Sequence, residues 1–173
     1  LLPNNVAILR KASLCFASAT LFLLYLTLRR TNANAVFALL CVISVGYLPT
    51  FQREGSSISV ETLQWFFLAM SIFSWQSLKC ARPLRRTWVF HFFVLAIALG
   101  LGACTKFIGV FTWVWICILS FYSFWQILGD VKLTTRQLLC YSACQVFFLG
   151  VVPLIIFTSS YTLQLNNWQI DTP

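Results

Sequence analysis

Residues 12–28 read ASLCFASATLFLLYLTL, a run of 17 residues without a charged side chain, and this stretch decides the fold. A helix needs roughly 17 to 25 apolar residues to cross the hydrocarbon core of a bilayer. The run from Leu21 to Leu26 does not alternate apolar and polar side chains as a membrane β-strand does. Because a backbone in hydrocarbon must satisfy its own hydrogen bonds, the stretch predicts a transmembrane helix.

Five further uncharged stretches follow in the 173-residue chain. They cover residues 31–52, 62–78, 87–105, 107–129 and 137–170, which are 22, 17, 19, 23 and 34 residues long. Only 9% of the residues are charged and 60% are hydrophobic, whereas about a quarter of an ordinary soluble domain is charged. The chain is therefore predicted to be an all-α membrane protein, a polytopic bundle of about six transmembrane helices. Because similar segments follow it, the first stretch is not a signal peptide.

The last stretch is longer than one crossing requires. We expect it to leave the membrane near Thr158, so that residues 1–160 form the transmembrane region and residues 161–173 a lumenal tail that leads to a further domain. The chain does not begin with methionine, and we expect a segment before it as well. The connections between stretches are short, which predicts that consecutive helices are antiparallel neighbours.

The basic residues predict an orientation. If the six segments alternate in direction, eight cations fall on one side and four on the other, and by the positive-inside rule the richer side is cytoplasmic. The richer side holds Arg29, Arg30, Lys79, Arg82, Arg85, Arg86, Lys132 and Arg136, and the other holds Arg10, Lys11, Arg53 and Lys106. Because these cations lie between spans and not on a soluble surface, the net charge of +8 does not indicate a nucleic-acid partner.

The sequence indicates neither a cofactor nor a metal. Nearly all of the seven cysteines lie inside apolar runs, so we expect small buried side chains. Cys140 and Cys144 share a helical face, but no second pair or nearby histidine completes a zinc site. His91, the one histidine, is expected to be a packed or interfacial side chain. No phosphate-binding glycine loop, nucleophile elbow or carboxylate pair with a partner base is present.

Three charged residues on the less basic side are candidate site residues. Arg10 either extends its side chain to the interface or contacts a ligand, since charges near the membrane are often retained for a partner. Lys106 stands alone beside a run of small residues that allows close helix packing, and it either binds a lipid phosphate or anchors the interface. Glu61 either favours a helix start or takes part in a site. A transporter would carry charges inside its spans, and the interiors here lack them.

At these residues the chain resembles the protein O-mannosyltransferases. The segment ALGLGACTKFIGVFT at residues 98–112, followed by Gly129-Asp130, is similar to the family's small-residue helix, its Ser-Lys-Trp-Val-Gly-Leu-Phe-Thr segment and a later Gly-Asp. Further matches stand in register at Leu24–Arg29 and at Leu149–Pro153. The resemblance extends over essentially the whole chain.

The resemblance implies a GT-C type helical fold in the membrane of the endoplasmic reticulum. It implies transfer of mannose from dolichyl phosphate mannose to Ser or Thr hydroxyls of secretory proteins on the lumenal face, and pairing with another family member. It aligns Arg10 with a family arginine, which favours a contact with the donor phosphate. Lys106 and Glu61 are then expected near the donor or the acceptor. The family's acidic pair, the presumed base, would precede Leu1.

Some positions depart from the family pattern. Leu48-Pro49 stands where the family has Glu-Asn, Ser56 where it has an arginine, and Gln164-Leu165 where it has His-Phe. Glu61 keeps the family's acid, and Arg53 can replace the arginine only through a local shift. These departures motivate an alternative, a noncatalytic membrane subunit that pairs with an active homologue.

Overall fold

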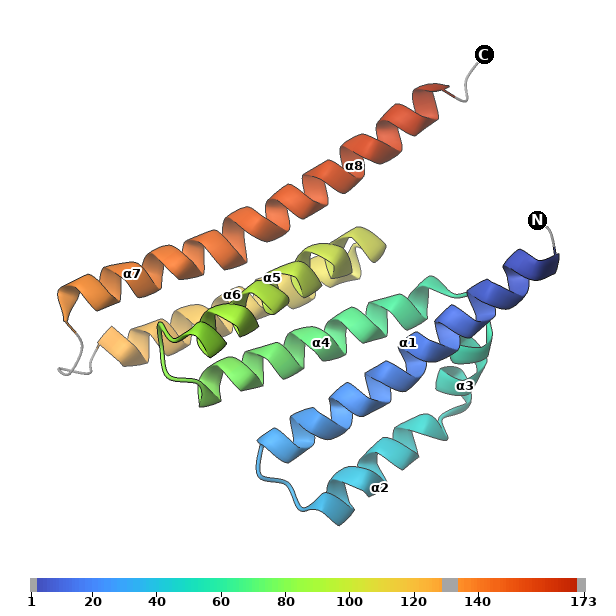
Figure 1. Cartoon of the computed structure of the whole chain (residues 1–173), viewed down its shortest axis with the longest axis horizontal. Coiled ribbons are helices and arrows are strands. Elements are labelled where there is room, and N and C mark those ends of the chain that lie inside the picture. Colours follow the sequence, from blue (N-terminus) through green and yellow to red (C-terminus); the bar gives the residue numbers. More distant parts are fainter. Residues whose placement is uncertain (1–2, 129–133, 171–173) are drawn as a thin grey trace.

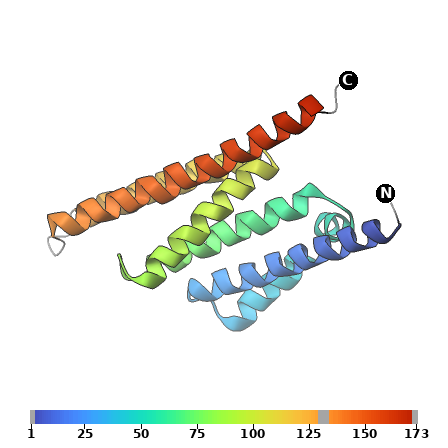
Figure 2. The ribbon, with the colours of Figure 1, turned by 45° about the horizontal axis from the view of Figure 1, so that its top comes forward.

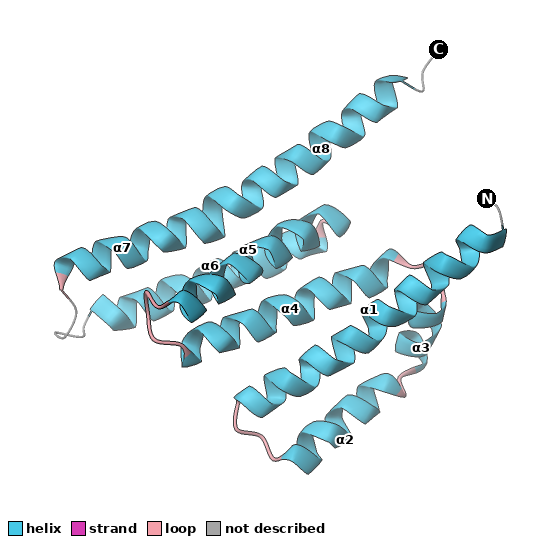
Figure 3. Ribbon diagram, in the orientation of Figure 1, coloured by secondary structure: helices cyan, strands magenta, loops and turns pink. Residues whose placement is uncertain are grey.

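The computed structural model describes residues 3–128 and 134–170, and the regular structure of these residues is helical throughout (Figure 3). The long helices run side by side in alternating directions (Figure 1). The all-α prediction is confirmed for the described residues. In chain order the elements are α1 (Pro3–Arg30), α2 (Ala35–Gly46), α3 (Pro49–Ser56), α4 (Val60–Cys80), α5 (Arg86–Thr105), α6 (Ile108–Leu128), α7 (Thr135–Gln145), the π-helical segment η1 (Val146–Val151) and α8 (Val152–Ile170).

Helical structure forms over each of the six predicted stretches. Four helical segments are long and apolar enough to cross a membrane, and a bent pair of helices makes a fifth candidate among the described residues. The four segments are Val6–Arg30, Arg86–Thr105, Ile108–Leu128 and Thr135–Asn166. The structure therefore has the multi-pass architecture that the sequence predicts.

The third stretch, residues 62–78, corresponds to α4, which is more polar than the other long helices. Its 21 residues span about 31 Å, close to the roughly 30 Å of a hydrocarbon core. Because α4 packs against both α1 and α5, five of its polar residues are buried inside the bundle, namely Thr62, Gln64, Ser71, Ser74 and Ser77. Ser71 and Ser77 donate hydrogen bonds to the carbonyls four residues before them, each at 2.8 Å, and so satisfy their hydroxyls locally. Burial of polar groups in the bundle explains why apolarity alone does not mark α4 as a span.

The second stretch, which the sequence predicts as one span interrupted at Leu48-Pro49, forms two helices with a bend between them. The 12 residues of α2 end at Gly46, and α3 leaves at an angle of 66°. Pro49 opens α3, and Leu48 before it is extended at φ −61° and ψ 127°. A proline disfavours helical backbone at the residue before it, so the chain bends here. At about 18 Å, α2 alone is too short for a crossing.

The last stretch is one long helical element with a distortion in the middle. Pro153 has no N–H, so it cannot bond the carbonyl of Leu149 four residues earlier. The indole nitrogen of Trp113 on α6 donates to that carbonyl at 2.6 Å. The helix continues to Ile170, so residues 161–170 are helical. The place where the chain leaves the membrane stays a prediction, and residues 171–173 lie outside the described part.

The bundle has two ends with different charges. We call one the basic end, which carries Arg29, Arg30, Lys79, Arg82, Arg85, Arg86 and Arg136, and the other the Glu61 end, which carries Arg10, Lys11, Arg53, Glu54, Glu61 and Lys106. The start of α1 and the end of α8 lie at the Glu61 end, and α5 crosses between α4 and α8 in the turned view (Figure 2). Lys132 falls in the segment 129–133, which is not described.

The cysteines are less buried than predicted. Cys15, Cys80 and Cys140 are exposed and the other four are half-buried. The prediction was wrong for the three exposed residues, because a long apolar run in a membrane protein has a lipid-facing side as well as an inward-facing side. Apolarity does not distinguish burial in protein from contact with lipid.

Candidate functional site

The start of α4 places Glu61 at the Glu61 end of the bundle. Ser59 is the N-cap of α4, and its side-chain oxygen accepts a hydrogen bond from the Glu61 amide at 3.1 Å. Glu61 therefore lies in the first turn, where the partial positive charge of a helix N-terminus favours a carboxylate. This local explanation of Glu61 was one of the two that the sequence allowed, and it leaves the carboxylate itself available to a partner.

The connection between α5 and α6 places Lys106 beside α4. Lys106 is the C-cap of α5 with extended backbone, and its carbonyl accepts a hydrogen bond from the Gly109 amide at 2.8 Å. A Cβ at Gly109 would lie 2.2 Å from the carbonyl oxygen of Gly102, so only glycine permits this turn without movement of the backbone. Gly102, which belongs to the run of small residues that predicted close packing, forms this close contact with Gly109 in the turn after Lys106.

Glu61 and Lys106 form an ion pair across this end of the bundle. Glu61 belongs to the first turn of α4 and Lys106 to the connection between α5 and α6, and the structure brings their side chains together. Their side chains are 37% and 47% exposed, respectively, so both groups remain accessible from outside the protein. An exposed pair of this kind contributes about 0–1 kcal/mol to stability. This ion pair therefore contributes too little free energy to be a main source of the stability of the fold.

A second contact beside the ion pair joins the same two helices. The Thr105 hydroxyl donates to the side-chain oxygen of Gln64 at 2.5 Å. Gln64 lies one turn after Glu61 on α4 and is 7% exposed. The sequence did not single out these two residues. The available signal was their position in the sequence: Gln64 is a polar residue three positions after Glu61, and Thr105 directly precedes Lys106.

A third polar contact joins α1 to α4 close to Glu61. The Ser13 hydroxyl donates to Thr62 at 3.2 Å, and the Thr62 hydroxyl donates to the carbonyl of Glu54 at 3.0 Å. Thr62 is fully buried. Arg10 lies three residues before Ser13, about one turn away on α1. It is exposed, and among the described residues neither a hydrogen bond nor an ion pair connects its side chain to Glu61 or Lys106.

The positions that depart from the resemblance lie in two places: Leu48, Pro49 and Ser56 lie at or on α3, and Gln164 and Leu165 lie on α8. Arg53 is exposed and has no ion pair within the described part of the chain. Ser56, which stands in place of the family's arginine, donates its hydroxyl to the Arg53 carbonyl at 3.0 Å. No group of three or more potential metal ligands occurs in the described ranges. His91 lies away from this site, against Phe73 and Phe90.

Comparison with known proteins identifies the family. The model of the dolichyl-phosphate-mannose-protein mannosyltransferases matches residues 2–168. This chain belongs to that family. It is 33% identical over 165 residues to probable dolichyl-phosphate-mannose--protein mannosyltransferase 7 of Saccharomyces cerevisiae, which covers 95% of this chain and 25% of that protein. It is 28% identical over 151 residues to dolichyl-phosphate-mannose--protein mannosyltransferase 5 of Candida albicans, and this match covers 87% of this chain and 21% of that protein.

A solved structure shares the fold of this mannosyltransferase-family chain. The S. cerevisiae protein O-mannosyltransferase Pmt1-Pmt2 complex bound to the sugar donor matches with a TM-score of 0.86 at 21% identity, over 91% of this chain and 22% of the matched one. The expected GT-C type fold is thereby confirmed. The chain spans about a quarter of the length of the relatives it matches.

Proposed function

We propose that this chain is part of an enzyme that transfers mannose from dolichyl phosphate mannose to Ser or Thr hydroxyls of secretory proteins. The family membership supports the assigned reaction, and the charged residues of the Glu61 end support the location of the active site at that end of the bundle. One observation carries the assignment: two accessible cations from separate helices, Arg10 and Lys106, lie at the end of the bundle with the fewer basic residues. In the proposed orientation this end faces the lumen of the endoplasmic reticulum.

The chemistry explains why cations are needed there. Transfer from a lipid phosphate breaks the bond between the sugar and the phosphate, and negative charge develops on the departing phosphate. A positioned cation stabilises that charge more in the transition state than in the ground state. In this proposal Arg10 contacts the phosphate, because its guanidinium is exposed and can bind two phosphate oxygens at once.

Glu61 and Lys106 act as a unit in the proposal. The carboxylate holds the lysine ammonium at the mouth of the site, and Lys106 presents part of its charge to the donor or the acceptor. Since Glu61 is engaged by Lys106, the base that takes the acceptor proton is assigned to another carboxylate. The acidic pair that the resemblance places before Leu1 is the candidate for that base.

A test of the function compares two adjacent cations of α1 in the full-length protein. Arg10→Ala is expected to abolish mannosyl transfer from dolichyl phosphate mannose to a Ser- or Thr-containing peptide, while membrane insertion is unchanged. Lys11→Ala is the matched control, because Lys11 is also exposed but points about 100° away around the helix. Transfer at the parent rate by Arg10→Ala would remove Arg10 from the site.

A second candidate function is a noncatalytic subunit that pairs with an active homologue. The observation that favours it is Ser56, whose hydroxyl bonds its own helix backbone where the family has an arginine side chain. The Pmt1-Pmt2 complex shows that family members assemble in pairs, and we propose a pair here too. Purified full-length protein separates the two functions: an enzyme transfers mannose in the assay above, alone or as a pair whose activity requires Arg10, whereas a subunit transfers only with its partner and independently of Arg10.

A further inference from the structure

A cavity lined in part by polar side chains, called the polar cavity below, lies at the basic end, at the opposite end of the bundle from the candidate site. It has a volume of about 520 Å³ and lies between the end of α4, the start of α5, the end of α6 and α7. Its lining includes hydrogen-bond donors of several kinds, namely Trp75, Lys79, Tyr122, Ser123, Gln126 and Tyr141. No acidic residue of the described chain lines it. The cavity therefore suits an anion.

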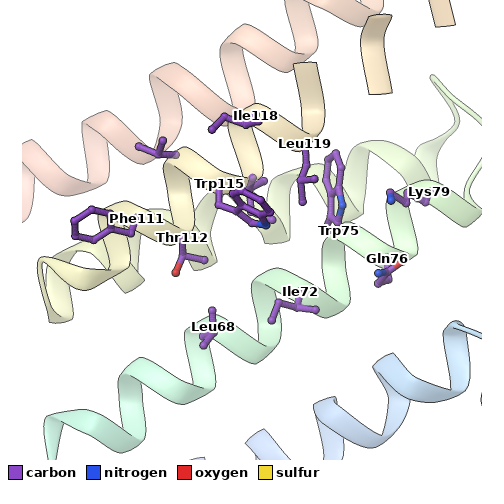
Figure 4. A pocket seen from close by; sticks show the side chains of 12 residues that line it. Leu68, Ile72, Trp75, Gln76, Lys79, Phe111, Thr112, Trp115, Ile118 and Leu119 are labelled. Carbon is purple, nitrogen blue, oxygen red and sulfur yellow. The ribbon is translucent and has the colours of Figure 1, made fainter. Parts of the chain in front are cut away.

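An apolar groove adjoins this cavity and shares two residues with it. The groove, of about 700 Å³, runs between α4 and α6, and Trp75 and Lys79 line both spaces. Figure 4 shows Lys79 at one end of the groove and Leu68 toward the other. From Leu68 to Lys79 the helix rises about 16 Å, roughly half of a 30 Å hydrocarbon core. The groove therefore reaches through one leaflet only, starting at the basic end.

Trp75 gives an independent sign of a ligand. Its side chain is only 6% exposed, and its indole nitrogen has no hydrogen-bond partner within the described residues. A buried N–H without a partner is unfavourable, so such groups are rare in native proteins. The Lys79 ammonium lies 5.7 Å from the centre of the Trp75 ring. A donor and a cation thus stand together where the polar cavity meets the apolar groove.

We propose that this combined site binds an anionic glycerophospholipid of the leaflet at the basic end. The headgroup phosphate lies in the polar cavity, near Lys79 and Gln126, and one acyl chain lies along the groove. Charge complementarity favours a net-negative headgroup, because Arg82, Arg85 and Arg86 follow Lys79 in the chain and are exposed at the same end. A zwitterionic headgroup carries no net charge, so these arginines favour it less.

Photo-crosslinking in reconstituted full-length protein tests the proposal. The protein is placed in vesicles of phosphatidylcholine with a trace of photoactivatable phosphatidylserine or photoactivatable phosphatidylcholine, and crosslinked peptides are located by mass spectrometry. We expect crosslinks on α4 and α6 within the groove, with phosphatidylserine about fivefold above phosphatidylcholine, the factor that one basic residue near a membrane surface gives.

Two variants, Lys79→Gln and Ile72→Trp, test binding of the lipid headgroup and binding of the acyl chain separately. Lys79→Gln is expected to reduce the preference for phosphatidylserine over phosphatidylcholine, whereas Arg29→Gln, which removes a charge at the same end outside both cavities, leaves the preference unchanged. Ile72→Trp fills the groove and lowers both signals. The proposal is overturned by equal crosslinking of the two lipids, by a preference that Lys79→Gln leaves unchanged, or by a groove without crosslinks because another part of the full-length protein covers it.

Discussion

The close turn between α5 and α6 makes Gly109 the most informative position for a stability test. In Gly109→Ala the new Cβ would stand 2.2 Å from the carbonyl oxygen of Gly102 and 2.5 Å from its carbonyl carbon. Ordinary contact begins at 3.4 Å, so the first distance is 1.2 Å too short. The obstacle is backbone and cannot rotate away, so α5 and α6 must move apart. The turn that positions Lys106 then changes as well.

The expected cost follows from this geometry. Forcing an extra carbon into a packed interior costs about 1–3 kcal/mol, and contact with rigid backbone places Gly109→Ala at the upper end, at about 2–3 kcal/mol. Gly150→Ala is the matched control, because nothing lies within 4 Å of its Cβ. There the smaller entropy loss of alanine predicts a gain of about 0.5–1 kcal/mol.

The measurement is the free energy of unfolding of the full-length variants in mixed detergent micelles, followed by circular dichroism. Mannosyl transfer is measured in parallel, and only Gly109→Ala is expected to lower it, because only that variant moves Lys106. Equal stability of the two alanine variants would refute the close α5–α6 approach. The same result would also refute the explanation of how Lys106 reaches Glu61.

Three further outcomes follow from single contacts. Trp113→Phe is expected to lower the free energy of unfolding by about 0.6–1.7 kcal/mol in the same micelles, since it leaves the Leu149 carbonyl without its donor; no change would mean that another donor satisfies this carbonyl. Thr62→Val removes both hydrogen bonds of the buried Thr62 hydroxyl and is expected to cost about 1–3 kcal/mol by the same measurement, and a neutral result would contradict the α1–α4 contact. Glu61→Gln and Lys106→Gln should each change stability by less than about 1 kcal/mol yet slow mannosyl transfer, so parent-level transfer in both would exclude the pair from the site.

The helices could be predicted from sequence because continuous apolar runs leave the backbone few alternatives in lipid. The break at Leu48-Pro49 was visible as an interruption, but the sequence did not show that α3 would form and turn by 66°. That angle depends on packing of α3 against α1 and α4. Residues 161–170 were expected as a tail, and their helical form was not foreseen because the apolar pattern weakens there.

The candidate site was predictable only in part. Glu61 and Lys106 were each singled out because an isolated charge near a membrane requires an explanation. Their pairing was not predictable, because the residues are 45 positions apart and meet only through the relative position of α4 and α5. Gln64 and Thr105 were missed for the same reason. The cysteines were judged from apolarity, which does not tell a lipid-facing residue from one buried in protein.

The account depends most on the two ends of the bundle facing opposite sides of the membrane. The direct measurement uses sealed microsomes that contain full-length Lys106→Cys or Arg86→Cys, treated with a membrane-impermeant maleimide carrying polyethylene glycol. Each variant is compared with the parent protein for one additional mass shift. We predict that Arg86→Cys gains the shift in intact microsomes, and that Lys106→Cys gains it only after the membrane is permeabilised. Labelling of both variants in intact microsomes would contradict the account.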